Sequence, residues 1–232
     1  AVGKPVVLVI SAGSALDLSW ADAHVAAIID SFYPGARGGK AVAEAIFGDF
    51  SPSGKLPVTF YQGTENLPEF TDYDMSDRTY RYTDKNVLYP FGYGLHYGTI
   101  RYENAQISCA QCSVRDAVDV SVDVINESSY TIHESVQAYI QHEEADAYEP
   151  GYQLKGIQTV TLQPKETKRV TISLKARDFA IITQEGECVV RPGSYRIAIG
   201  GQQPDARSAK LTGSDVAALV VRREGAQTPV EY

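Results

Sequence analysis

The first sixty residues carry two hydrophobic patterns, one typical of a buried strand and one typical of a helix. Residues 6–10 read VVLVI, a continuous apolar run that suits a parallel strand buried on both faces. Apolar side chains then recur at the i, i+3, i+4, i+7 spacing of one helical face, namely Val25, Ile28, Ile29 and Phe32. A weak capping box of Ser19 and Asp22 predicts the start of this helix, and Pro34-Gly35 predicts its end.

The same segment predicts a second helix and a second strand. The helix spans about residues 39–47, with Gly48 at its C-terminal cap and a buried side made of Ala41, Val42, Ala45 and Ile46. Residues 56–60 predict the strand. A strand like VVLVI needs neighbouring strands and a layer on each face, and two strands with two helices do not supply them. We therefore expect residues 1–60 to be part of an α/β sandwich whose sheet is completed by an upstream segment or another polypeptide.

Residues 99–212 show a different pattern, in which apolar and polar positions alternate along short runs. The alternating positions are Val118, Val120, Val122 and Val124; Val136, Ala138 and Ile140; Val170, Ile172 and Leu174; and Tyr195, Ile197 and Ile199. Short alternating strands separated by turns indicate an antiparallel β-sandwich. Residues 213–232 lie beyond this pattern, and we expect a tail or a linker there.

Residues 61–98 connect the two regions and are rich in Tyr, Asp, Pro and Gly, with little periodicity. A solvated linker would not usually carry so many aromatic side chains. Tyr combines a large apolar surface with one hydroxyl group, which suits a packed and partly polar interface. We interpret this connector as a strap clamped against a domain surface. The functional alternative is the lining of a sugar site, with Asp72, Asp74, Arg78 and Tyr80 as the candidate binding residues.

Composition excludes some partners. The chain has 232 residues, 44% of them hydrophobic and 22% charged, and a formal net charge of −8. A nucleic-acid or anionic-membrane partner would call for a basic face, so we expect neither. No apolar run approaches the ~20 residues of a membrane span. We therefore expect a soluble protein, and the choice between the cytoplasm and secretion stays open.

The sequence predicts neither a cofactor nor a bound metal. His133 and His142 are nine residues apart, which puts them on opposite faces of a regular strand and argues against joint ligation. The acidic run from Glu143 to Glu149 lacks the spacing of a calcium loop and predicts a solvated turn. Asn126-Glu-Ser128 is a glycosylation sequon by letter only. Cys109, Cys112 and Cys188 are expected to be free thiols on strands, although a disulfide between two of them stays open.

Several motifs carry a resemblance to a known family. Residues 33–61 read YPGARGGKAVAEAIFGDFSPSGKLPVTFY, followed by RTYRY at 78–82 and YPFGYGL at 89–95. These motifs, in this order, resemble glycoside hydrolase family 3, the β-glucosidases and β-xylosidases, near the end of their second catalytic domain. The pieces LKGIQTVTLQP, ARDFA and VRPGSYRIAIGG resemble the fibronectin type III-like domain that closes many of these enzymes.

The resemblance implies a retaining, exo-acting β-glycosidase with no cofactor, acting on terminal non-reducing β-linked sugars. It implies a β-glucosidase first and a β-xylosidase next. In that family a barrel domain supplies an Asp nucleophile and the following α/β sandwich supplies a Glu acid/base, both upstream of the segment that matches. No catalytic residue is therefore transferred to this chain, which we expect to be inactive by itself. The implied partners are the barrel with the upstream α/β segment and an oligosaccharide or β-glycoside substrate; homo-oligomers stay open. The alternative is a stand-alone, non-catalytic module that binds carbohydrate or protein.

Overall fold

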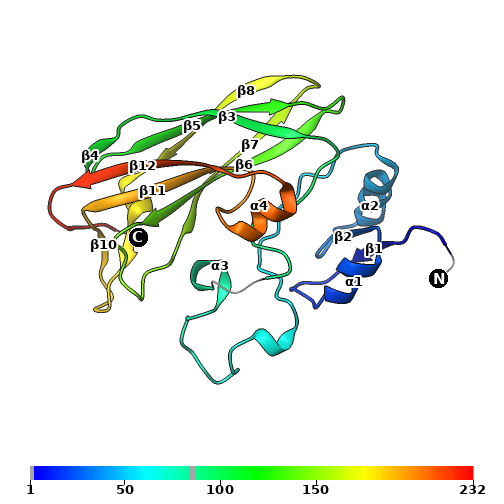
Figure 1. Ribbon diagram of the computed structural model, residues 1–232, viewed down its shortest axis with the longest axis horizontal. Helices are drawn as coiled ribbons and strands as arrows, with labels where there is room; N and C mark the ends of the chain where they lie inside the picture. The colour runs from blue at the N-terminus through cyan, green and yellow to red at the C-terminus, as the bar shows by residue number, and fades with distance from the viewer. Residues whose placement is uncertain (1–2, 84–86, 232) are drawn as a thin grey trace.

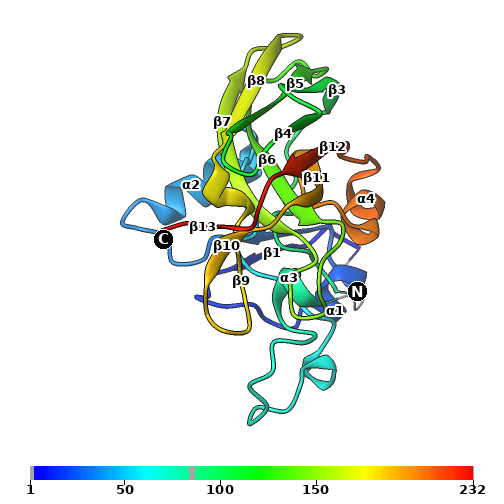
Figure 2. The same ribbon diagram turned by 90° about the vertical axis from the view of Figure 1, so that its left-hand side faces the viewer.

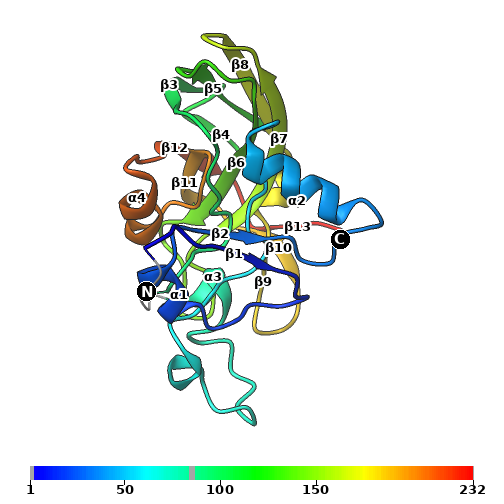
Figure 3. The same ribbon diagram turned by 90° about the vertical axis from the view of Figure 1, so that its right-hand side faces the viewer.

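The computed structural model describes residues 3–83 and 87–231 and contains a small α/β segment, a long connector and a β-sandwich (Figure 1). The α/β segment comprises β1 (Val7–Ile10), α1 (Ser19–His24), β2 (Ala27–Asp30) and α2 (Gly38–Phe47). β1 and β2 pair in parallel, as expected for β1. The two helices lie on opposite sides of this two-stranded sheet in both Figure 1 and Figure 3. The fold class, an α/β segment followed by an all-β sandwich, is confirmed.

The predicted helix through Ile28 and Phe32 is wrong, because most of that stretch is extended. α1 ends at His24, Val25 is already extended, and the Ala26 amide donates to the Val6 carbonyl at 2.8 Å. The β-branched side chains of the AIID run favour a strand, and a period of 3–4 over so few apolar positions does not separate the two structures. The capping box is also absent. Asp17 instead accepts a hydrogen bond from the Ser19 amide.

α2 is confirmed, with Gly48 in the left-handed conformation at its C-terminus, but its predicted buried side is largely open. Ala45 is buried, whereas Ala41 and Ile46 are exposed and Phe47 is 83% exposed. The predicted strand at residues 56–60 is wrong as well. Pro57 lacks an amide proton, and only Phe60 forms an isolated bridge, with Tyr89. β1 is less buried than expected, with Val7 and Val9 exposed.

The sandwich contains the strands that alternation predicted, among others. One sheet has five strands in the order β4-β12-β11-β6-β7, and the other has three in the order β3-β5-β8. The bounds of the five-stranded sheet are β4 (Gln111–Ser113), β12 (Ala217–Glu224), β11 (Gly193–Gly200), β6 (Ile132–His142) and β7 (Gln153–Leu162). Those of the three-stranded sheet are β3 (Ile100–Ile107), β5 (Val118–Asn126) and β8 (Thr167–Leu174). Their inner faces form the main core.

Shorter elements cover the ends of the sandwich. β9 (Ile181–Ile182), β10 (Cys188–Val190) and β13 (Thr228–Pro229) form a small sheet. α4 (Ala206–Thr212) connects β11 to β12, and the 3-10 helix η2 (Ala176–Phe179) follows β8. Residues 213–232 are therefore not a tail or linker, because β12 pairs with both β11 and β4 inside the five-stranded sheet.

The connector crosses between the two regions and contains η1 (Thr64–Asn66) and α3 (Thr79–Tyr82). Its first half forms an arm, residues 61–78, which projects away from the end of the molecule that carries β8 (Figures 1 and 2). Its second half packs closely, as the strap interpretation predicts. Gly92 has a φ of +76°, and a Cβ at Gly92 would collide with Gln137 and Tyr139; one at Gly94 would collide with the Gly54 carbonyl.

No helix in the described part of the chain is long and apolar enough to cross a membrane.

Candidate functional site

Three of the four predicted binding residues lie together in the arm. The side chain of Arg78 bonds to three backbone carbonyl groups of the arm. Its Nη2 donates to the carbonyl oxygens of Asp72 at 2.6 Å and Glu69 at 3.1 Å, and its Nε donates to the carbonyl oxygen of Asp74 at 3.0 Å. One guanidinium group thus ties three carbonyls of an irregular loop, a task that suits its rigid fork of donors. Arg78 therefore organises the arm.

The two aspartates of the arm shape its turns. Asp72 Oδ1 accepts from the Asp74 amide at 2.9 Å, and Asp74 Oδ1 accepts from the Ser76 amide at 2.7 Å. Side-chain bonds to a backbone amide two residues on are typical of Asx turns. The hydrogen bonds from Ser76 lower the pKa of Asp74, so this exposed carboxyl group is ionised at neutral pH.

Tyr80 lies apart from these three residues. Its ring stacks on Phe91 with centroids 4.1 Å apart, and its hydroxyl oxygen accepts a hydrogen bond from the Leu154 amide at 3.1 Å. Tyr139 and Tyr152 of the sandwich contact the same ring. Tyr80 therefore anchors the connector to the sandwich.

The outer part of the arm exposes large apolar side chains beside its carboxylates. Phe70 is 93% exposed and Tyr73 is 89% exposed, and Leu67 and Met75 are open as well. The arm thus combines carboxyl groups, aromatic faces and a fixed backbone. Such a combination can bind sugar hydroxyl groups and stack on a pyranose ring.

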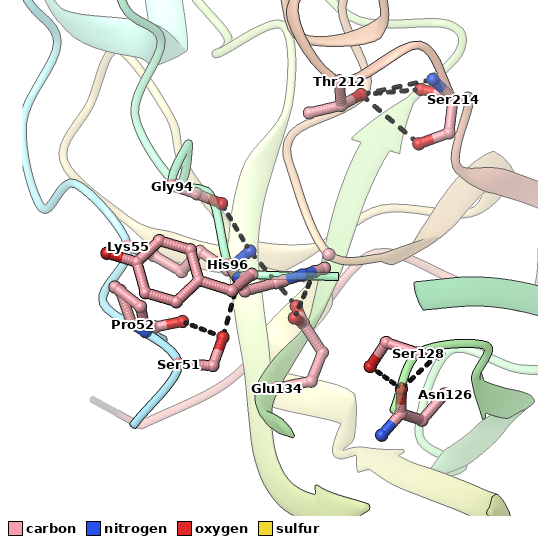
Figure 4. Close-up of polar contacts among 12 residues, drawn as sticks. Ser51, Pro52, Lys55, Gly94, His96, Asn126, Ser128, Glu134, Thr212 and Ser214 are labelled. Carbon is pink, nitrogen blue, oxygen red and sulfur yellow. Dashed lines mark hydrogen bonds and ion pairs between the residues drawn. The ribbon is translucent and has the colours of Figure 1, made fainter. Parts of the chain in front are cut away.

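A buried polar cluster joins the three parts of the chain, and the sequence interpretation missed it (Figure 4). Glu134 of β6 is 1% exposed, with Oε1 at 3.2 Å from Lys55 Nζ and Oε2 at 3.5 Å from His96 Nε2. Lys55 also donates to the Gly94 carbonyl at 3.1 Å. The signal was present, because Glu134 occupies an inward position of the strand that continues through Val136 and Ala138.

Burial shifts the pKa of His96 and of the neighbouring Tyr102. Burial is the largest cause that lowers the pKa of His96, and Lys55 adds to it, whereas Glu134 opposes both. Burial and then Glu134 raise the pKa of Tyr102 well above its usual value. The cluster connects Lys55 of the first segment and His96 of the connector to Glu134 of the sandwich. Its role is to fix their relative position.

The histidines, acidic residues and cysteines that the sequence analysis singled out lie on the surface or in packed parts of the sandwich. His133 is exposed on β6, whereas buried His142 lies 3.0 Å from Glu149 Oε2. Glu149 is not in a solvated turn as expected. It is buried, and it also pairs with Arg191 at 2.7 Å. The three cysteines are free, and Cys109 lies outside the strands, in the connection between β3 and β4. Among residues 3–83 and 87–231, no group of three or more His, Cys, Asp and Glu side chains could hold a metal ion.

Two family models match this chain in succession. The glycosyl hydrolase family 3 C-terminal domain matches residues 1–97, a range that includes the first segment and nearly all of the connector with its arm. The fibronectin type III-like domain matches residues 134–203.

Curated relatives and solved structures agree with these matches. A β-xylosidase of Formosa agariphila is 34% identical over 217 residues, which is 90% of this chain and 30% of the relative. A periplasmic β-glucosidase of Salmonella typhimurium is 33% identical over 212 residues, 86% of this chain and 28% of the relative. The structure of a β-glucosidase of Listeria innocua in complex with isofagomine superimposes with a TM-score of 0.79 at 26% identity, covering 97% of this chain and 32% of that one. The chain thus spans about a third or less of the proteins it matches.

Proposed function

The chain belongs to glycoside hydrolase family 3, and from this we propose that it is the C-terminal portion of a retaining, exo-acting β-glycosidase that releases terminal non-reducing β-linked sugars. The observation that carries the proposal is the succession of the two domain matches across most of the chain. The family resemblance ranks β-glucosidase first and β-xylosidase next. Relatives of both names match at similar identity, and a β-glucosidase is among the solved structures that match.

We place the catalytic nucleophile and the acid/base outside these 232 residues. A retaining glycosidase needs two carboxyl groups about 5–5.5 Å apart across the scissile bond. The carboxylates of the arm, Asp72 and Asp74, are exposed and engaged in local turns. Relatives that are about three times longer have room for the missing machinery.

The partner that supplies this machinery is the upstream α/β segment with its barrel, as part of the same enzyme or as a second chain. Exposed apolar side chains gather in the part of the chain that it would cover. They include Val7, Val9, Trp20, Tyr33, Phe47, Phe70 and Tyr73. Apolar exposure of this extent on one region is typical of an interface. The upstream segment would add strands beside β1 and β2 and cover α2.

In this assembly the arm borders the sugar site. Asp72 and Asp74 would accept hydrogen bonds from sugar hydroxyl groups, Arg78 would hold their backbone, and Tyr80 would anchor the arm to the sandwich. Aromatic side chains at the tip of the arm would stack on the ring or on the covering segment.

The test is an activity assay with and without the upstream segment. The 232-residue chain is assayed on an aryl β-glucoside and an aryl β-xyloside, alone and after addition of the purified upstream segment. We expect no hydrolysis by the chain alone and hydrolysis of at least one substrate by the mixture. Hydrolysis by the chain alone would refute the placement of both carboxyl groups elsewhere. No activity in a mixture that forms a stable complex would favour the non-catalytic module.

A second assay addresses the arm. Asp72→Asn in the active mixture is expected to raise KM by about tenfold, as for the loss of one hydrogen bond to a charged group. Asp119→Asn, an exposed aspartate on β5 of the sandwich, is the matched control. An unchanged KM for Asp72→Asn and Asp74→Asn would remove the arm from the substrate site.

A further inference from the structure

A cavity of about 390 Å³ lies on the sandwich, away from the tip of the arm. Its wall combines residues from three elements that are distant in sequence: Arg81 of α3, Lys155 of β7 and Arg177 of η2. Its volume falls in the range of small-molecule sites, which is roughly 300–1,000 Å³.

The three cationic groups differ in exposure. Within the described residues, the side chains of Arg81, Lys155 and Arg177 make no hydrogen bond and no ion pair, and Arg81 lies 6.0 Å from the centroid of the Tyr80 ring. Arg81 and Arg177 are exposed, so water solvates them, whereas Lys155 is half-buried. None of the three has to give up a carboxylate or carbonyl partner to bind an anion in the cavity.

Lys155 is the least solvated of the three. It is half-buried, and burial lowers its pKa, with the positive charge of Arg81 as the next cause, whereas Asp178 opposes both. A partly buried cation beside a second cation loses solvation and gains repulsion. An anion in the cavity would oppose this repulsion.

Other residues of the cavity wall indicate the chemistry of an anion that would fit there. Asp178 and Glu231 also line the cavity, so three cations face two carboxylates and the difference is one positive charge. Tyr82 and Tyr148 contribute aromatic rings, and Gln153 contributes an amide. Aromatic rings with polar groups between them suit the flat apolar face and the hydroxyl groups of a sugar ring.

We propose that this cavity binds a carboxylate-bearing monosaccharide. Arg81, Lys155 and Arg177 bind its carboxylate, and Tyr82 and Tyr148 contact its ring. The site is separate from the arm and does not depend on the proposed hydrolase activity, because it needs only residues of this chain.

The test is an NMR titration of the isotope-labelled chain with glucuronate, and with glucose and inorganic phosphate as comparisons. We expect saturable shifts of the amides near Arg81, Lys155 and Arg177 with glucuronate, weakening as salt is raised. Glucose should cause no saturable shift, and phosphate should bind at least about tenfold more weakly because it lacks the ring contacts. Absence of saturation with glucuronate, or equal responses to phosphate or glucose, would overturn the proposal.

Variants locate the binding. Arg177→Gln and Arg81→Gln change exposed side chains, so folding should be preserved, and each should weaken glucuronate binding about fivefold or more through loss of a charge-assisted contact. Arg115→Gln is the matched control, an exposed arginine of the β4–β5 turn, and should leave the affinity unchanged. Equal weakening in all three variants would mean that only the overall charge of the protein matters, and would overturn the assigned site.

Discussion

At the residue scale, a buried carboxylate holds the three parts of the chain together. Removing one partner from such a cluster leaves an uncompensated charge in the interior, which costs about 3–5 kcal/mol. Lys55 would lose its carboxylate in a Glu134→Ala variant while its side chain stays mostly covered. The geometry therefore makes Glu134 the group that holds Lys55 of the first segment and His96 of the connector against the sandwich.

The same cluster predicts a pH dependence. The pKa of His96 lies below 6.5 in the folded chain, so the unfolded chain binds more protons as the pH falls through that value. The contribution of His96 to stability is complete above pH 6.5. It is lost as the pH falls from there to the lowered pKa of the folded state. The unfolding free energy, measured by chemical unfolding, should decrease less between pH 7.5 and pH 5 for His96→Gln than for the unchanged chain.

The control for this experiment is His133→Gln, an exposed histidine of the same strand as Glu134. This variant should keep the pH dependence of the unchanged chain. If His96→Gln and His133→Gln behave alike, His96 does not supply the predicted dependence.

Asn126 is a second residue whose role differs from what its sequence motif suggests. It is fully buried, and its Nδ2 donates to the carbonyl oxygens of Tyr130 at 2.7 Å, Gln163 at 3.0 Å and Leu162 at 3.3 Å. A glycan would replace one of the two hydrogens on this fully buried nitrogen, so its attachment would disrupt these contacts and open the surrounding structure. The sequon is therefore a structural motif.

We expect Asn126 to remain unmodified when the chain is secreted by a glycosylating host, which intact mass would report. Asn126→Ala should lower the unfolding free energy by about 2 kcal/mol, because buried carbonyl groups lose their donor. Ser128→Ala also destroys the sequon, but it removes only contacts to Asn126 and Tyr130, so its loss of stability should be smaller. A glycan at Asn126, or an equal loss in both variants, would contradict this interpretation.

At the element scale, strands with a long alternating pattern could be predicted from the sequence, whereas short strands could not. β5 could be predicted because each inward valine is buried and each intervening residue is more open. β2 could not, since four residues are too few to distinguish a strand from a helix, and its pairing with β1 decided the outcome. Of the candidate site, the arm residues Asp72, Asp74 and Arg78 were predicted from the sequence, and their contact with a sugar stays a prediction. The Glu134 cluster was not, because Lys55 and His96 reach it only through tertiary contacts.

β12 is the element whose prediction failed with the largest consequence. Its seven residue pairs with β11 and its parallel contact with β4 make it an inner strand, although its sequence follows the region that alternation defined. Truncation after residue 212 should therefore abolish cooperative unfolding, because β11 loses a neighbour and buried Val221 and Arg223 are removed. Circular dichroism during thermal denaturation would report this loss.

Truncation after residue 226 is the matched control. It removes β13, which pairs with two residues of β10, and the half-buried Val230, so the melting temperature should fall by a few degrees at most. A chain ending at 212 that unfolds cooperatively near the original temperature would show that residues 213–232 are dispensable.

At the scale of the whole molecule, the chain has two cores of unequal size. Among the described residues, the sandwich core contains eighteen buried apolar side chains, whereas the core that the first segment shares with the connector contains five, including Ile10, Phe60 and Leu88. Specific contacts connect them: Arg207 of α4 donates to the Leu88 carbonyl at 2.9 Å, and Lys55 pairs with Glu134 of β6 at 3.2 Å. These polar contacts fix the orientation of the first segment without adding much apolar burial.

This inequality predicts two levels of local stability. Burial of apolar surface stabilises by about 25 cal/mol per Å², so the segment with exposed Val7, Val9 and Phe47 should open at a much lower free energy than the sandwich. Hydrogen exchange should be fast in β1, β2 and α2 and slow in β5 and β6. Addition of the upstream segment should slow exchange in β1, β2 and α2 while leaving β5 and β6 unchanged. Equal protection throughout the chain alone would mean that the first segment is stable without a covering partner, which would remove the physical basis for proposing one.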